Sequence, residues 1–338
     1  MKIVLWSFVV IFLLTGFQDI VKKNSISQNF DLIELSDGVY ACINKFGGKA
    51  ICNAGIIDLG NETLIFDTFL SPDAAKELIS TVEKYKLSPI KYIVNSHYHN
   101  DHIRGNQIFS KNIDIISTAR TAQLIKEKEP IEIEAEKSYA PVRLAYYDSL
   151  LNNYSGSFSD REYKSIIIWQ AYYQVLTETN SFLETRIPNV FVNKLKEIKG
   201  SKRNAQLITK GKGHTESDLI LYLPDEKILF TGDLVFIGMH PYLADGYKNE
   251  WYDYLSYLQG LEINKLVPGH GKVGTREDIL MMKKYLKMID GVSNNIIKNK
   301  LSVDQIEQTK IPEPYTNWWF ESFFFINLKF TTSELLGN

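Results

Sequence analysis

The chain has 338 residues, of which 44% are hydrophobic and 23% charged, and its net charge is −2. This composition is typical of a globular protein with a sizeable core, and it disfavours a disordered chain or a basic nucleic-acid-binding protein. We therefore expect a small-molecule substrate and no nucleic-acid partner, while the oligomeric state stays open.

The N-terminus carries the first organised feature. Lys2 precedes an almost wholly apolar segment, residues 3–17, followed by the polar residues 18–29. This is the pattern of a secretory signal, and at about 15 residues the segment is short for a membrane span of roughly 20. The sequence thus predicts an exported protein, periplasmic or secreted. Residues 1–29 would be a signal peptide or a retained N-terminal anchor plus linker, and only such an anchor would associate with a membrane.

The rest of the chain alternates between strand and helix patterns. Strands are expected in residues 30–67, 90–95, 113–117, 205–209, 219–223, 227–230 and 265–267, and helices at about 72–86, 250–261 and 276–298. Residues from 119 to about 187 are rich in Glu, Lys and Tyr, with helical periodicity in segments such as 161–176, and predict a helical insertion. We expect α/β layers with a mixed sheet in one domain, residues 30–338, with a C-terminal helical extension from about 276.

Two cysteines flank a predicted turn. Cys42 and Cys52 lie on either side of Phe46-Gly47-Gly48-Lys49, which places them on neighbouring strands. A disulfide is compatible with an oxidising compartment, and two small buried side chains are an equally good interpretation. Neither cysteine is near a histidine along the chain, so we do not expect them to bind metal.

The central motif is a dense cluster of metal-binding residue types. Three of the six histidines fall in the run His97-Tyr98-His99-Asn100-Asp101-His102, directly after the predicted strand 90–95. Imidazoles and a carboxylate are the ligands that zinc and similar metals accept. In an extended or tightly turning loop, His97 and His99 point the same way, and Asp101 and His102 can face a second point nearby. One short loop can therefore serve two metals.

Three further segments supply candidate ligands in the same layout. His214, Asp233 and His270 each follow a predicted strand on a turn that contains glycine. Glycine allows sharp turns and close backbone approach. Each segment is a weak signal alone, but together with the cluster they use five of the six histidines in one pattern.

With these motifs the sequence resembles the metallo-β-lactamase superfamily of metallo-hydrolases, with a glyoxalase II-like ligand set. The matching residues are His97, His99, Asp101, His102, Gly213-His214-Thr215, Thr231-Gly232-Asp233 and Pro268-Gly269-His270-Gly271. The resemblance implies a four-layer αβ/βα sandwich of two mixed β-sheets flanked by helices. It implies a site at the edge where the strand ends meet.

The resemblance also implies a role for each residue. His97, His99 and His214 would bind the first metal; Asp101, His102 and His270 would bind the second; Asp233 would bridge the two. Asp67 matches the early aspartate motif and would orient a ligand histidine, although a residue of a strand-end turn is the alternative. Two Zn²⁺ ions are the default cofactors, with manganese or iron as alternatives.

The predicted activity is hydrolysis by a metal-bound hydroxide. Metal coordination makes hydroxide accessible near neutral pH and polarises the substrate carbonyl. We expect cleavage of an ester, thioester, lactone or amide, with Asp101 and Asp233 as the catalytic carboxylates and Asp101 moving protons.

Three alternatives remain at this stage. A true β-lactamase would hydrolyse β-lactam antibiotics, but relatives in one such subclass carry Cys where this chain has Asp233. A non-haem iron oxidoreductase, such as a persulfide dioxygenase-like enzyme, would bind one iron with fewer ligands. A metal-dependent nuclease would need a basic surface that the composition does not suggest.

Residues outside the ligand set are more ambiguous. His240 lies in a loop shortly after Asp233 and is a candidate for a substrate contact at the pocket rim, although a lone loop histidine is more often structural. The aromatic residues of the insertion either line a substrate cleft or, as we favour, pack the insertion onto the domain; they are Tyr146, Tyr147, Tyr154, Tyr163, Trp169, Tyr172 and Tyr173. The aromatic residues 318–325 are expected in the core or at an oligomer face.

Overall fold

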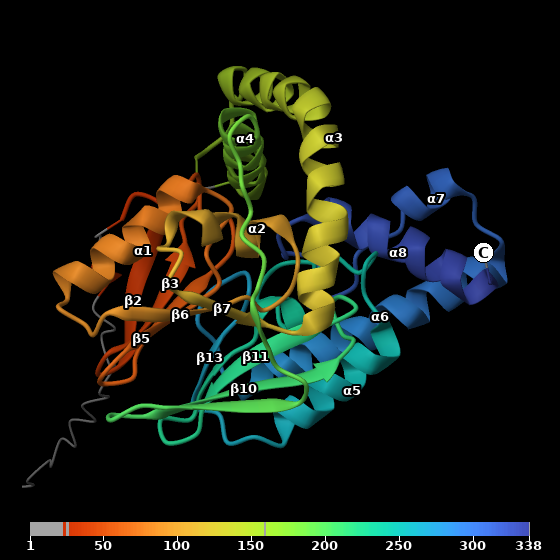
Figure 1. The fold of residues 1–338 in the computed structure, drawn as a ribbon. Coiled ribbons are helices and arrows are strands. Elements are labelled where there is room, and N and C mark those ends of the chain that lie inside the picture. The colour runs from red at the N-terminus through yellow and green to blue at the C-terminus, as the bar shows by residue number, and fades with distance from the viewer. Residues whose placement is uncertain (1–22, 25–26, 159, 338) are drawn as a thin grey trace, which may run out of the picture.

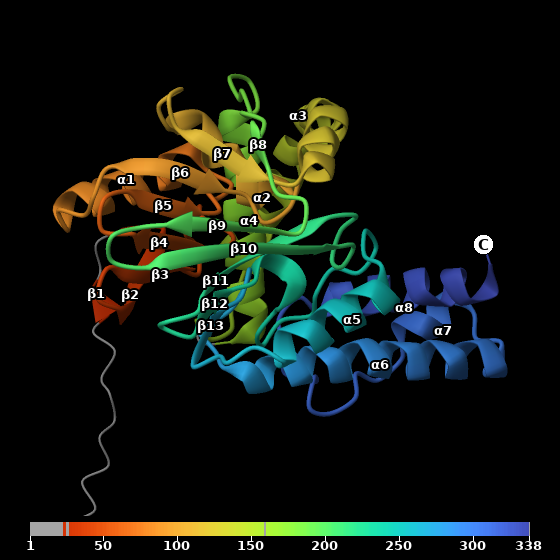
Figure 2. The ribbon, with the colours of Figure 1, turned by 60° about the horizontal axis from the view of Figure 1, so that its bottom comes forward.

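The structure, a computed structural model, describes residues 23–24, 27–158 and 160–337. Two mixed β-sheets pack face to face with helices on both outer faces, which confirms the predicted αβ/βα sandwich (Figure 1 and Figure 2). The apolar N-terminal segment on which the prediction of export depends lies outside the described residues. Among the described helices, none combines the length and the apolar character that a bilayer span requires.

The first sheet has eight strands in chain order. They are β1 (Lys23–Asn24), β2 (Phe30–Ser36), β3 (Val39–Asn44), β4 (Ala54–Asp58), β5 (Thr63–Phe66), β6 (Ile90–Val94), β7 (Asp114–Ser117) and β8 (Val190–Phe191). Neighbours from β1 to β5 are antiparallel, whereas β5, β6, β7 and β8 are parallel. The carboxyl ends of β5, β6 and β7 therefore meet at one edge of the sheet.

The second sheet has five strands in the order β13-β12-β11-β10-β9. They are β9 (Leu195–Lys199), β10 (Asn204–Gly211), β11 (Asp218–Leu223), β12 (Ile228–Phe230) and β13 (Lys265–Val267). Only β12 and β13 are parallel; the other neighbours are antiparallel. The sequence did not predict β8 or β9, because β8 is very short and β9 is a largely exposed edge strand with only Ile198 buried.

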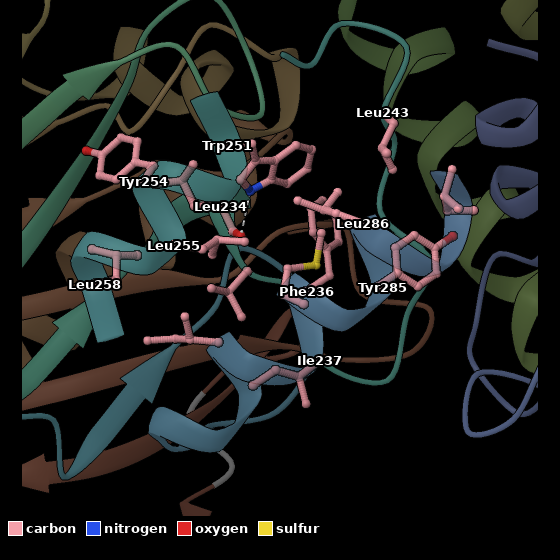
Figure 3. Close-up of a cluster of buried hydrophobic side chains, with 14 of the residues drawn as sticks. Leu234, Phe236, Ile237, Leu243, Trp251, Tyr254, Leu255, Leu258, Tyr285 and Leu286 are labelled. Atoms are coloured by element: carbon pink, nitrogen blue, oxygen red, sulfur yellow. Dashed lines mark hydrogen bonds between the residues drawn. The ribbon is translucent and has the colours of Figure 1, made fainter. Parts of the chain in front are cut away.

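Three apolar layers hold the sandwich together. Side chains such as Phe66 and Phe230 meet between the two sheets. On the outer face of the first sheet packs α1 (Pro72–Lys84), whose first turn is capped by the Ser71 hydroxyl. On the outer face of the second sheet pack α5 (Lys248–Gln259) and α6 (Arg276–Asn299). Figure 3 shows this third layer, in which the Trp251 indole donates a hydrogen bond to the Leu234 carbonyl at 3.0 Å.

The insertion is helical, as predicted. It consists of α3 (Ala119–Asn152) and α4 (Arg161–Thr179), which pack against each other and stand above the sandwich in Figure 1. The short helix α2 (Asn100–Ile103) and the 3-10 turns η1 (Arg104–Ile108) and η2 (Gly232–Leu234) belong to the loops of the site. At the C-terminal end, α7 (Val303–Glu307) and α8 (Glu321–Leu336) follow, and α8 packs on α6.

A buried ion cluster fixes α3 to the loop after β6. Arg104 is fully buried, and its Nε lies 2.8 Å from Oε1 of Glu129 while its Nη1 lies 2.8 Å from Oε2 of Glu136. Both carboxylates come from α3. Breaking a buried pair of this kind leaves an uncompensated charge, so the cluster strongly favours one position of α3 over the site.

Candidate metal centre

Both sheets contribute to one polar cluster at their adjoining edges. The run of residues 97–102 follows β6, and His214, Asp233 and His270 follow β10, β12 and β13. Close approach of these loops depends on glycine at two points: a Cβ on Gly269 would lie 1.8 Å from Oδ1 of Asp233, and Gly232 adopts φ +53° against Ser96. The glycine turns recognised in the sequence are therefore needed to bring the loops together.

Four residues form a first group. The ligand-type atoms of His97, His99, His214 and Asp233 all lie within 4.8 Å of one another. Nε2 of His214 is 3.1 Å from Nδ1 of His99 and 3.4 Å from Oδ2 of Asp233. Nitrogen and oxygen atoms arranged in this way could hold one metal ion.

A second group lies on the other side of Asp233. His102 Nε2 is 3.2 Å from Oδ1 of Asp233, and His270 Nε2 is 3.4 Å from its Oδ2. Asp101 joins this group, since its Oδ2 is 3.3 Å from Nε2 of His270. Asp233 thus contacts both groups, as the resemblance implied for a bridging carboxylate.

The buried polar atoms of the cluster fit a metal ion. Nε2 of His97, Nε2 of His102 and Oδ1 of Asp233 are buried and make no hydrogen bond of acceptable geometry with the described residues. Leaving such atoms unpaired costs about 1–3 kcal/mol each. Coordination of two divalent metals would satisfy all three.

The electrostatics of the cluster agree with this fit. Burial lowers the pKa of His214 to about 3, so that ring is neutral at pH 7, as metal ligation requires. Burial acts against a charged His270, but Asp233 and Asp101 together raise its pKa to about 9. Excess carboxylate charge on the second group therefore attracts a cation, either a proton or a metal.

Asp67 holds the His102 ring. Its Oδ2 lies 2.8 Å from Nδ1 of His102, and it also accepts hydrogen bonds from the amide and hydroxyl of Ser96, each at 2.8 Å. A carboxylate on Nδ1 favours the tautomer whose Nε2 is free to bind metal. The geometry is that of a residue orienting a ligand histidine. Ser96 similarly contacts Nδ1 of His97 at 2.9 Å.

Asp245 plays the corresponding part for His99, and the sequence analysis missed it. Its Oδ2 is 3.0 Å from Nε2 of His99 and accepts a hydrogen bond from the Tyr98 hydroxyl at 2.8 Å. Lys128 donates to the same hydroxyl at 2.7 Å. Burial acts to raise the pKa of Asp245, but the hydrogen bonds from His99 and Tyr98 hold it below its usual range. The one feature of the sequence that could have indicated Asp245 is its position as a short polar residue beside glycine, in Ala244-Asp245-Gly246.

His240 does not lie at the pocket rim, so this prediction is corrected. The side chain is fully buried, and its Nδ1 is 3.0 Å from the Tyr285 hydroxyl. It packs against Trp318 and Phe324 in the core beside α6 and α8. Phe236 and Ile237 still run beside His270, and only the residues after them carry His240 into the core, a path that its short distance from Asp233 along the sequence did not indicate.

Comparison with known proteins agrees with this arrangement. The profile of the Metallo-beta-lactamase superfamily matches residues 47–270. The chain belongs to the metallo-β-lactamase superfamily. All seven histidine and aspartate residues of the two groups fall within the matched region.

Individual members of the superfamily have low sequence identity to this chain. Two proteins named metallo-beta-lactamase type 2, from Bacillus sp. (strain 170) and Bacillus cereus, are each 24% identical to the chain. The matches cover 80% and 79% of this chain and 86% of each relative.

Two solved structures share the fold. A double mutant of the sec-alkyl sulfatase PisA1 has a TM-score of 0.64 at 16% identity, over 90% of this chain and 50% of the sulfatase chain. A metallo-beta-lactamase from Pontibacter korlensis has a TM-score of 0.55 at 16% identity, over 77% of this chain and 99% of its own. This chain therefore spans about half the length of the sulfatase.

Cys52 is the second residue that sequence reasoning placed wrongly. Cys42 and Cys52 are both free and buried, as one of the two interpretations predicted. Cys52, however, donates a hydrogen bond to the Asp101 carbonyl at 2.8 Å, and its sulfur lies within 4.8 Å of ligand atoms of Asp101 and His102. Burial raises the pKa of this thiol to about 12. The chain folds back after the turn, so separation along the sequence hid the proximity.

A cavity of about 480 Å³ opens onto the metal cluster. Its floor includes His99, Asp101, His214, Asp233 and His270. Its walls come from α3, α4 and α8 and from the loop that carries Tyr242 and Asp245. Of the seven aromatic residues singled out in the insertion, Trp169 and Tyr172 line this cavity and also pack between helices, so both interpretations hold for them. The other five, which do not line it, make ring contacts within the insertion.

Proposed function

We propose that this protein is a binuclear metal-dependent hydrolase that cleaves an ester, thioester, lactone or amide, with zinc as its metal. The observation that carries the proposal is the position of Asp233 between two sets of ligand atoms, facing His214 on one side and His102 on the other. The chain belongs to the Metallo-beta-lactamase superfamily, and two relatives are named metallo-beta-lactamase type 2, which is a hydrolytic activity. The ligand types are those that zinc accepts.

Asp101, Asp67 and Asp245 would have separate roles in the hydrolysis. Metals bound by the two groups would supply Lewis acidity that lowers the pKa of a water molecule and polarises the scissile carbonyl. Asp101 lines the cavity, and its carboxylate would accept the proton that the attacking water loses. The same proton would then pass to the leaving group. Asp67 and Asp245 would keep the His102 and His99 rings in position throughout.

Metal analysis together with an activity panel tests the proposal. We expect two zinc ions per chain by mass spectrometry and hydrolysis of at least one substrate among nitrocefin, S-lactoylglutathione, lactones and phosphodiesters. His99→Ala and Asp233→Ala should each abolish the activity and reduce the metal content. Full activity in both variants would overturn the shared site, and iron with oxygen uptake would indicate an oxidoreductase instead.

A β-lactamase is the second candidate function. The two relatives named metallo-beta-lactamase type 2 match about four fifths of the chain, which favours it. The nitrocefin arm of the panel separates this function from the broader proposal. Hydrolysis of nitrocefin, a β-lactam, and of none of the thioester, lactones and phosphodiesters in the panel would establish it.

A further inference from the structure

The cavity above the metal cluster has walls of a consistent chemistry. Aromatic and aliphatic side chains from four helical or loop segments dominate them, among them Tyr139, Trp169, Tyr172, Tyr242, Phe320 and Phe323. No lysine or arginine is among the described residues that line it. A substrate body that fits such walls is apolar.

The basic side chains near the cavity, Lys128 and Arg104, already bind other side chains. Lys128 on α3 donates to the Tyr98 hydroxyl and lies over the Tyr98 ring at 4.3 Å. Arg104 is buried between Glu129 and Glu136 beneath α3. Neither side chain lines the cavity, so nothing on these walls neutralises a negative charge on a substrate.

Most carboxylates of the cavity are also committed. Asp101 and Asp233 belong to the metal cluster, Asp245 binds His99, and Glu136 binds Arg104. Glu132 is different, since within the described part of the chain its carboxylate has no hydrogen bond and no ion pair. The side chain is half-buried on α3, one turn after Lys128, and lines the cavity.

The charged form of an unpaired carboxylate is destabilised in this position. Burial first, and the nearby Glu129 second, raise the pKa of Glu132. A cation placed beside it would relieve both effects, and the aromatic rings around it would add cation–π attraction. An anion would be repelled by the same carboxylate and would find no basic partner on the walls.

We propose that the cavity binds substrates with an apolar body whose end remote from the scissile bond carries an ammonium group, which pairs with the Glu132 carboxylate, and that it discriminates against a carboxylate at that end. Glu132 is then a specificity-determining residue of the hydrolase. The inference rests on the proposed function for the reaction itself, but the recognition of the ammonium group stands apart from it.

Three matched esters test the discrimination. The metal-loaded protein is assayed at neutral pH with 4-nitrophenyl hexanoate, 4-nitrophenyl 6-aminohexanoate and the 4-nitrophenyl monoester of adipic acid, which are neutral, cationic and anionic at the remote end. We expect kcat/KM to be about tenfold higher for the cationic than for the neutral ester, as a charge-assisted hydrogen bond gives, and lowest for the anionic ester. An anionic ester hydrolysed as fast as the cationic one would overturn the proposal.

Variants of α3 assign the effect to Glu132. Glu132→Gln should lower kcat/KM for the cationic ester to that for the neutral ester, so that the preference between the two is lost. Glu134→Gln is the matched control, because Glu134 is exposed on the same helix, pairs with Lys137 and does not line the cavity. An unchanged preference in Glu132→Gln, or a loss of preference in Glu134→Gln, contradicts the assignment.

A binding measurement separates this inference from the proposed function. Hexylammonium and hexanol are titrated into the metal-loaded protein while the fluorescence of Trp169 in the cavity wall is followed, with Trp169→Phe as the signal control. Tighter binding of hexylammonium that is lost in Glu132→Gln supports the inference even where no ester is hydrolysed, an outcome in which only the proposed reaction fails. Equal binding of the two probes overturns the inference whatever the activity.

Discussion

Replacing Asp67 by asparagine changes the hydrogen-bonding capacity of this side chain while leaving its size almost unchanged. The carboxylate accepts three hydrogen bonds at 2.8 Å, two from Ser96 and one from Nδ1 of His102. An asparagine in its place has a single acceptor oxygen, so the amide nitrogen must face at least one of these donors. The backbone at this position has φ +59°, a left-handed conformation that asparagine tolerates well, so Asp67→Asn should fold.

The substitution should weaken binding of the second metal, the one that His102 would hold. If the amide faces His102, the ring proton moves from Nδ1 to Nε2, the atom that lies 3.2 Å from Asp233 and would bind the metal. Loss of such an orienting partner costs about 10- to 100-fold in metal affinity, or roughly 1.4–2.8 kcal/mol. We therefore expect Asp67→Asn to bind one metal almost normally and the other at least tenfold more weakly.

Competition with a chromophoric chelator measures both affinities, and mass spectrometry gives the metal content. Asp58→Asn is the matched control, because Asp58 accepts a hydrogen bond from the Gly60 amide in a turn away from the site. Two metals bound by Asp67→Asn with unchanged affinities would refute the reasoning about the His102 tautomer.

The remaining predictions concern other buried polar groups. Asp245→Asn removes the carboxylate 3.0 Å from Nε2 of His99 and should weaken the first metal about tenfold in the same competition assay, leaving the second unaffected. Burial, and to a lesser degree Arg161, lowers the pKa of His240 to about 4, below its unfolded value of about 6.5. The neutral ring therefore stabilises the fold fully above about pH 6.5, and this contribution of about 3 kcal/mol is lost as the pH falls towards 4. In urea unfolding between pH 7 and pH 4, the free energy of unfolding of His240→Asn should fall by about 3 kcal/mol less than that of the unchanged protein. An equal fall in the two proteins would contradict this prediction. Glu129→Gln leaves Arg104 without one of its two partners and should lower the free energy of unfolding by about 3 kcal/mol, with a change below 1 kcal/mol arguing against the ion cluster as an anchor of α3.

The chemistry of the site was largely readable from the sequence because metal ligation requires particular side chains. His97, His99, Asp101 and His102 lie on one short loop, and the spacing within such a loop limits where the side chains can point. The glycines beside His214, Asp233 and His270 indicated turns at strand ends, and strand ends in a layered α/β fold meet at a common edge. Asp67 was found through its match to the early aspartate motif of the superfamily, and the structure places it directly after β5.

Tertiary structure alone decided the contacts that join residues distant along the chain. Asp245 and Cys52 reach the cluster because separate loops fold back onto it, whereas His240, only seven residues after Asp233, is carried into the core. The Glu132 carboxylate enters the cavity because Arg104 pins α3 above the site. Sequence by itself determined which histidine and aspartate side chains are the candidate metal ligands, because that depends on residue type and local spacing. The substrate cavity depends on how helices from the insertion and the C-terminal region pack over the site, and local patterns do not specify that packing.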